Sequence, residues 1–145
     1  MKIRNVWKLE DLKEPLEIHE DRRGKISDIF YNEEINHVAI VSSEPNIIRG
    51  NHYHKKTTQY TLITKGSLDY WFKTVGCDHP ARKISAFTGD LICTPPNEIH
   101  ALQMGPDGNE FVVFTSGPRG GKDYEADTFR VENSIVEVDN KEKTK

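Results

Sequence analysis

Two histidines one residue apart, His52 and His54, are the side chains of this sequence best suited to chemistry. In an extended strand residues i and i+2 share a face, so both imidazoles are predicted on one side and Tyr53 on the other. Gln59 follows at the start of a predicted strand, and a third histidine, His100, comes much later in the chain. If the strand of His100 lies beside that of the pair, three imidazoles and one amide converge on one site.

Three roles are open for this group: a metal cage, an acid–base pair, or packing. An imidazole has an unperturbed pKa of about 6.5 and can take up or return a proton near neutral pH. Imidazoles also suit zinc, iron and nickel, and three of them suffice to hold zinc with an open position for water. The amide of Gln59 could be a fourth ligand or could only orient an imidazole. Because an amide is uncharged, we expect weaker metal binding than a glutamate at position 59 would give.

Short runs rich in β-branched and aromatic residues must position these side chains. The runs are bounded by turns that contain Gly, Pro, Asn or Asp, which is typical of antiparallel β proteins. Strands are predicted over residues 37–43, 59–65, 67–73, 83–88, 90–95, 100–104 and 110–116. This spacing predicts an all-β antiparallel barrel or sandwich. Short helical turns are predicted within 7–16, before Pro15, and within 122–129.

The chain of 145 residues has the length of one ordinary domain. We expect a single domain over residues 1–139 and a polar, disordered tail over 140–145. The net charge of −3, without a block of like charges outside the tail, disfavours a nucleic-acid or membrane partner. No signal-peptide core or transmembrane run is visible, so a cytoplasmic location is expected. Cys77 and Cys93 form no C-x-x-C motif and are expected to be free thiols.

The order of these residues resembles the two signature motifs of the cupin superfamily. The first motif joins His-x-His to an acidic residue and a glycine, and here reads His52, His54, Gln59 and Gly66. The second joins glycine, proline, histidine and asparagine, and here reads Gly89, Pro95, Asn97, His100 and Met104. Gln59 replaces the usual glutamate, and Met104 replaces the usual asparagine. The resemblance implies an all-β cupin fold, a double-stranded β-helix or jelly-roll barrel of two antiparallel sheets.

Shorter segments resemble enzymes of nucleotide-linked deoxysugars. RGNHYHKKTTQ, residues 49–59, resembles the signature of deoxysugar 3,4-ketoisomerases, and RGNHYH resembles the cupin domain of capsular-polysaccharide reductase/epimerases, in which histidines and a glutamate hold zinc. DRRG, residues 21–24, is similar to a turn of keto-sugar 3,5-epimerases, and DYEADTFR, residues 123–130, is similar to the end of the ketoisomerases. The resemblances imply a nucleotide sugar as substrate.

The leading hypothesis is therefore an isomerase or epimerase of a nucleotide-linked 4-keto-6-deoxyhexose, in deoxysugar or polysaccharide biosynthesis. His52 or His54 would remove a proton next to the keto group and return it elsewhere, which requires no cofactor. The enediolate so formed needs a donor near its oxygen. A second imidazole, Tyr60, Tyr70 or a bound cation are the candidates.

Other side chains are candidates for holding the substrate. Arg23 and Arg49 could bind the diphosphate, because a planar guanidinium donates two hydrogen bonds at once. Trp71 could stack on the nucleotide base. We also expect a homodimer, because an exposed strand edge needs covering.

Two other functions stay open. A metal-dependent cupin enzyme of the oxygenase or hydrolase type would hold zinc, iron or nickel through His52, His54, Gln59 and His100. A non-catalytic cupin would only bind a sugar. Purely structural roles also stay open for several residues. These are packing for Tyr60, Tyr70 and Trp71, salt-bridged turns for Arg23 and Arg49, and ordinary structural positions for His19, His37 and His79.

Overall fold

The computed structural model describes residues 1–137 and is built almost entirely of β-structure. Its strands are β1 (Lys2–Asn5), β2 (Ile18–Asp21), β3 (Gly24–Ser27), β4 (His37–Ser43), β5 (Ile48–Tyr53), β6 (Thr58–Thr74), β7 (Arg82–Phe87), β8 (Asp90–Thr94), β9 (Glu98–Ser116) and β10 (Phe129–Arg130). The two predicted helical regions contain only single 3-10 turns, η1 (Leu9–Asp11) and η2 (Gly121–Asp123). The predicted domain end at residue 139 and the predicted tail over 140–145 lie outside the described residues.

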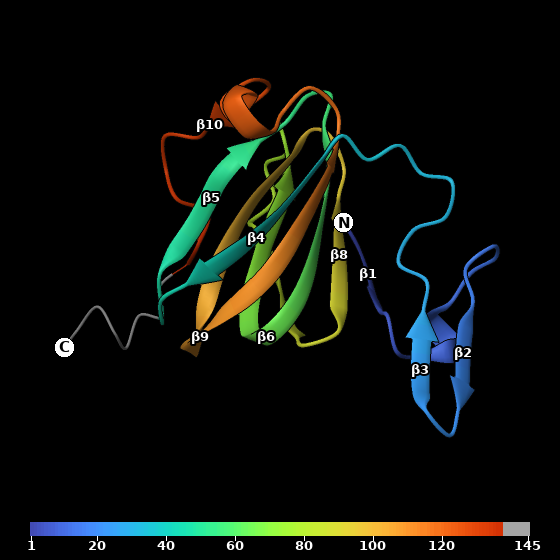
Figure 1. Cartoon of the computed structure of the whole chain (residues 1–145). Helices are drawn as coiled ribbons and strands as arrows, with labels where there is room; N and C mark the ends of the chain where they lie inside the picture. The colour runs from blue at the N-terminus through green and yellow to red at the C-terminus, as the bar shows by residue number, and fades with distance from the viewer. Residues whose placement is uncertain (138–145) are drawn as a thin grey trace.

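The strands form an antiparallel barrel whose two sheets share the long strands β6 and β9 (Figure 1). In one sheet, β4 pairs with the second half of β9, and the first half of β6 pairs with β8, which pairs with β1. In the other sheet, β10 pairs with β5, β5 with the first half of β9, and β7 with the second half of β6. The predicted fold, a cupin barrel of two antiparallel sheets, is confirmed.

Two predicted turns are bends inside continuous strands. The sequence predicts separate strands on either side of residues 65–67 and 105–109, whereas β6 and β9 run through both regions. Gly66 and Gly108 adopt positive φ of 75° and 73°, and the register of the β6–β9 pair shifts on either side of Gly66. Glycine tolerates this backbone conformation, so the strands bend from one sheet into the other without breaking.

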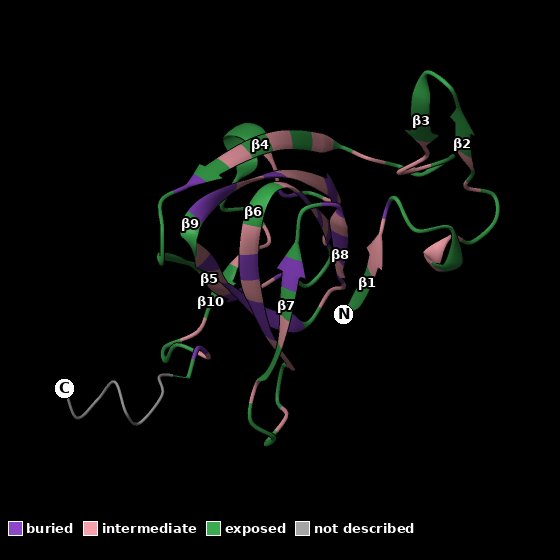
Figure 2. Ribbon diagram, turned by 90° about the horizontal axis from the view of Figure 1, so that it is seen from below, coloured by how far each residue is buried: buried purple, intermediate pink, exposed green. Residues whose placement is uncertain are grey.

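The barrel interior changes from apolar to polar along its axis. Near the bend it is filled by a hydrophobic core that includes Ile63, Leu68, Tyr70, Ile92, Leu102, Met104 and Phe111. Farther along the same strands the inward positions become polar: Gln59 lies opposite Thr94 on β8 and Thr115 on β9, and all three side chains are buried. Figure 2 shows buried stretches on β6, β8 and β9. Burying polar side chains is unfavourable unless they find partners, so this end of the barrel is a candidate site.

The β2–β3 hairpin stands apart from the barrel (Figure 1). Arg4 holds the segment after it, because its Nη2 donates to the carbonyl oxygens of Asp28 and Ile29. Within residues 1–137, β4 pairs only with β9, so its other edge is free. The expected homodimer stays a prediction. None of the helical turns in the described part of the chain is long and apolar enough to cross a membrane.

Gly50 permits the close approach of β5 to β9. Its φ is 94°, and a Cβ at this position would lie 2.8 Å from the carbonyl oxygen of His100. The register of the β5–β9 pair shifts just after it, between Gly50 and His52. A side chain at this position would therefore push apart the two strands that carry His52 and His100.

We predict that Gly50→Ala destabilises the protein more than Gly76→Ala does. Both glycines have positive φ, and at Gly76 an added Cβ meets nothing within 4 Å. Both variants thus incur the backbone cost of about 1–2 kcal/mol, and only Gly50→Ala adds a clash worth about 1–3 kcal/mol. Urea unfolding of the two variants measures the difference. Equal losses of stability would show that β5 can move away from β9 at little cost.

Candidate active site

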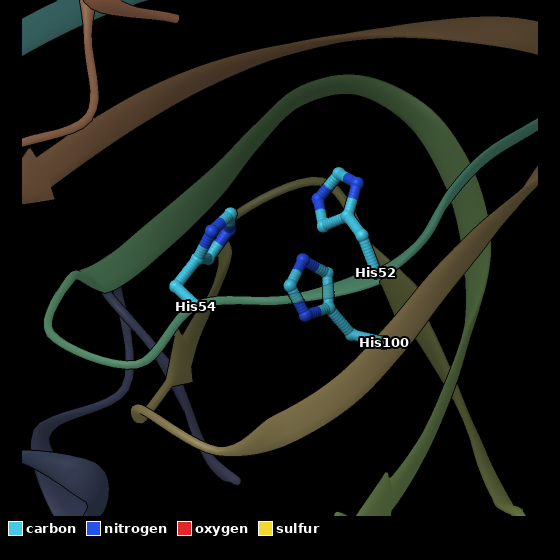
Figure 3. Close-up of side chains that lie close together, drawn as sticks. All are labelled: His52, His54 and His100. Carbon is cyan, nitrogen blue, oxygen red and sulfur yellow. The ribbon is translucent and has the colours of Figure 1, made fainter. Parts of the chain in front are cut away.

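Three imidazoles converge at the polar end of the barrel. His52 lies on β5 directly opposite His100 on β9, and His54 follows the end of β5. One ring nitrogen of each residue lies within 4.8 Å of the others, and Figure 3 shows the rings facing one another. The ring centroids of His52 and His54 are 5.0 Å apart. The prediction that these two histidines share a face and meet His100 is confirmed.

Two of these histidines are oriented by backbone carbonyls. The Nδ1 atom of His54 lies 2.8 Å from the carbonyl oxygen of Asp127, and that of His100 lies 3.1 Å from the carbonyl oxygen of Glu98. A carbonyl can only accept, so each Nδ1 carries the proton and each Nε2 keeps a lone pair. Both Nε2 atoms are buried, and neither has a hydrogen-bond partner among residues 1–137. Each is therefore ready to accept a proton or to ligate a metal.

Burial holds the imidazoles in the neutral form. Desolvation, with smaller contributions from the neighbouring imidazoles and Arg119, lowers the pKa of His52 to about 2. Desolvation likewise lowers the pKa of His100 to about 3, and it lowers the pKa of His54 despite the hydrogen bond to Asp127. These values lie well below the 6.5 expected from the sequence, because low polarity and nearby positive charge both disfavour an imidazolium. A bound anion would act in the opposite direction and raise each pKa.

Gln59 is held by an arginine that the sequence prediction missed. Arg119, in the loop after β9, donates from Nη1 to Oε1 of Gln59 at 3.3 Å. Its Nε donates to the hydroxyl of Thr128 at 3.1 Å, and its guanidinium lies over the ring of Tyr124 at 4.4 Å. Because the amide oxygen already accepts from a cation, this geometry favours an orienting role for Gln59 over that of a metal ligand.

A pocket of about 400 Å³ opens onto this cluster. Its walls combine apolar side chains of β4, β5 and β9 with three arginines, Arg49, Arg119 and Arg130. Its lining contains His52 and His100, and no aspartate or glutamate among the described residues. A pocket with fixed positive charges and no acid is complementary to an anionic ligand.

The segment from Tyr124 to Arg130 closes one side of the site. The carboxylate of Asp127 accepts from the backbone amides of Lys55, Lys56 and Thr57, at 2.8 to 2.9 Å. The carbonyl of the same residue accepts from His54, so Asp127 fixes both this histidine and the turn that follows it. In β10, Arg130 pairs directly with His52, which places both side chains on the pocket side.

Of the other predicted site residues, Arg49 lies at the pocket and Tyr70 lies behind it. Arg49 lines it, held by hydrogen bonds to the hydroxyl of Ser43 and the carbonyl of Ser42. Tyr70 lies behind the histidines in the core, where its hydroxyl is hydrogen-bonded to Thr94 at 2.6 Å and burial raises its pKa. It is therefore placed to support the cluster rather than to contact a ligand in the pocket.

Three predicted residues lie away from the pocket. Tyr60 follows the inward-facing Gln59, so strand alternation turns its ring outward, against Phe30. Trp71 likewise alternates with Tyr70 and packs outside the barrel with Val136. Arg23 is at the tip of the β2–β3 hairpin, paired with Asp21 at 2.6 Å, as the salt-bridged-turn alternative describes. These positions agree with the structural roles considered for them, which are packing for Tyr60 and Trp71 and a salt-bridged turn for Arg23.

The sequence analysis missed three basic side chains of the pocket: His37, Arg119 and Arg130. His37 was assigned an ordinary structural role, yet it begins β4 at the pocket wall. Arg130 lies within the segment that resembles ketoisomerases and could have been found there. Arg119 occurs in a glycine-rich loop, and its approach to Gln59 depends on contacts between residues 60 positions apart.

Comparisons with known proteins agree with this architecture. The family model described as "Polysaccharide biosynthesis C-terminal domain" matches residues 19–116. No curated protein matches the sequence. Among solved structures, QdtA, a sugar 3,4-ketoisomerase from Thermoanaerobacterium thermosaccharolyticum in complex with TDP, is similar with a TM-score of 0.64 and 20% identity, over 81% of this chain and 85% of that chain.

Two further solved structures share the fold. The dTDP-4-dehydrorhamnose 3,5-epimerase from Sulfolobus tokodaii is similar with a TM-score of 0.64 and 15% identity, over 86% of this chain and 78% of that chain. The capsular polysaccharide assembling protein CapF from Staphylococcus aureus has a TM-score of 0.59 and 20% identity, over 86% of this chain and 34% of that chain. The chain thus spans about a third of CapF. At these identities the likeness shows a common cupin fold.

We predict that Asp127→Ala loosens the turn after His54. The variant removes the acceptor of three backbone amides and places alanine at a φ of 58°, so we expect a loss of about 1–3 kcal/mol in the free energy of unfolding. Asp127→Asn, which retains one acceptor oxygen and tolerates this φ, should lose less. Urea unfolding measures both, with Asp123→Ala in the exposed η2 turn as the control. Similar stability of Asp127→Ala and Asp123→Ala would contradict the role given to this carboxylate.

Proposed function

The chain belongs to the family of polysaccharide biosynthesis C-terminal domains, and from this we propose that it is an isomerase or epimerase of a nucleotide-linked 4-keto-6-deoxyhexose. The observation that carries the proposal is the pairing of neutral, buried imidazoles with a pocket that contains three arginines and no acid. The imidazoles can move a proton, and the arginines suit the diphosphate of a nucleotide sugar. QdtA, which shares the fold, has been solved as a variant with TDP-4-keto-6-deoxyglucose, and this supports the substrate class.

His52 is the best-placed base. Both candidates, His52 and His54, belong to the cluster, but only His52 lines the pocket. In the proposed reaction His52 takes a proton from the carbon next to the keto group, the electron pair of that C–H bond forms a C=C bond, and the carbonyl π pair moves to the oxygen. The proton then returns to another carbon or to the opposite face. His54 and His100, anchored through Nδ1, keep the imidazoles of the cluster in fixed positions.

The positive potential of the pocket makes the strength of the base depend on a bound anion. In the ligand-free site the pKa of His52 is too low for it to carry a proton at neutral pH. The negative charge of the substrate, and of the enediolate as it forms, would favour the imidazolium. The base would therefore gain strength only when the correct ligand is bound.

We predict that His52→Asn abolishes turnover while leaving the fold nearly intact. A polar residue at the pocket wall contributes little apolar burial, whereas no other group in the proposed reaction takes the proton at that position. The assay follows solvent deuterium entering TDP-4-keto-6-deoxyglucose by NMR, with urea unfolding alongside. His79→Asn, at an exposed turn position, serves as the control. Parallel losses of stability and exchange would favour a packing role for His52, and wild-type protein that binds sugar nucleotides without exchange would favour a non-catalytic binding protein.

A metal-dependent cupin enzyme is the second candidate, favoured by one observation. The free Nε2 atoms of His54 and His100 face the cluster, and their Nδ1 atoms are anchored by carbonyls, as in many metal-ligating histidines. His52, His54 and His100 would hold a divalent zinc, iron or nickel ion, with Gln59 as an optional fourth ligand. When bound, such an ion would polarise a substrate oxygen. Arg119 beside Gln59 opposes a second cation at this position, so binding should be weaker than in a site with a carboxylate.

We predict that the chain captures a transition metal when it is supplied but exchanges protons without one. The protein is treated with a chelator until emission spectroscopy finds less than about a tenth of an equivalent, and deuterium exchange into the keto sugar is then measured. Exchange should persist, because the neutral imidazole is itself the base. Exchange that vanishes with the metal and returns with one specific ion would promote the metal-dependent enzyme over the metal-free reaction.

A further inference from the structure

Within the described part of the chain, Arg119 is a buried cation without a salt-bridge partner. Its exposed fraction is 7%, and its described contacts are the neutral oxygens of Gln59 and Thr128 and the ring of Tyr124. Among residues 1–137, no carboxylate oxygen lies within 4.0 Å of its guanidinium. A buried charge is costly unless it is paired, so this arrangement is best satisfied by an anion from outside the chain.

The three arginines of the pocket lie at different depths. Arg49 and Arg130 are exposed, and Arg130 is held by two hydrogen bonds to Glu125, at 2.6 and 2.9 Å. Arg119 is instead bonded to Gln59, which belongs to the same buried layer as the histidines. Arg119 is therefore the guanidinium that acts on the reacting end of the pocket.

We propose that Arg119 is a catalytic residue whose guanidinium binds the enediolate oxygen of the substrate, while Arg49 and Arg130 bind the diphosphate. The inference rests on the proposed function and assigns the oxyanion donor that this function needs. Tyr60 points away from the pocket and Tyr70 is bonded to Thr94, so neither of the tyrosines considered for that role is placed for it.

The proposed step is balanced without a redox partner. His52 takes the proton, the C–H electron pair forms the C=C bond of the enediolate, and the carbonyl π pair becomes a lone pair on the oxygen. That oxygen accepts N–H hydrogen bonds that the guanidinium of Arg119 donates. Arginine stays protonated throughout, so it stabilises the charge without taking part in proton transfer. Its bonds to Thr128 and Gln59 fix the guanidinium before the charge develops, which is the condition for effective oxyanion stabilisation.

The test separates the rate of exchange from the affinity for the nucleotide. For Arg119→Gln we expect a fall in kcat for deuterium exchange of about 100- to 1,000-fold, with the Kd for TDP, measured by calorimetry, unchanged within experimental error. For Arg49→Gln and Arg130→Gln we expect the reverse, with weaker TDP binding and higher KM at a nearly constant kcat. Arg119→Lys keeps the charge and serves as the second variant if Arg119→Gln does not fold; it should retain TDP binding and lose kcat, because lysine lacks the planar fork.

Three other outcomes would contradict the catalytic role proposed for Arg119. Unchanged kcat in a folded Arg119→Gln or Arg119→Lys variant would overturn the catalytic role alone and leave the proposed function standing. A matched loss of TDP affinity would make Arg119 a diphosphate ligand instead. Wild-type protein that exchanges no deuterium would overturn the proposed function, and the role of Arg119 with it.

Discussion

The pairing of β5 with β9 is the interaction on which the site depends. It places His52 opposite His100, and it requires the close approach that glycine at position 50 allows. From this pairing follow the facing imidazoles, the position of His54 beyond the strand end, and the register in which Arg130 of β10 meets His52. The rest of the barrel supplies a rigid frame for these two strands, with an apolar core at the bend and a polar layer at the open end.

Strand periodicity made part of this site predictable. The alternation of His52 and His54 predicted the cluster of imidazoles, and the resemblance of their order with Gln59 and His100 to the cupin motifs implied the cupin barrel. The same alternation, applied to Gln59 and its neighbour, would also have turned Tyr60 outward. The roles suggested for Tyr60 and Trp71 rested on residue type rather than on face, and the faces of the strands separate both rings from the pocket.

The rest depends on contacts that no local pattern encodes. Arg119 contacts Gln59, and Asp127 contacts the backbone of Lys55. The partners of these two contacts are 60 and 72 positions apart in the sequence. The low pKa of His52 has the same origin, because it reflects mainly burial, with smaller contributions from the imidazoles of His100 and His54 and from the charges of Arg119 and Arg130. A pKa shift of this kind can be inferred only from the folded structure, because it depends on burial and on charges that are distant in the sequence.

The anchoring of His54 by Asp127 also bears on when the site can form during synthesis of the chain. On the ribosome the barrel strands emerge first, and residues 52–54 leave the exit tunnel long before residue 127 does. Until then the ring of His54 lacks its carbonyl partner and the turn over 55–57 lacks its carboxylate. The nascent chain can thus close much of its barrel before the reactive cluster is set, and the site is completed only after residue 127 has emerged.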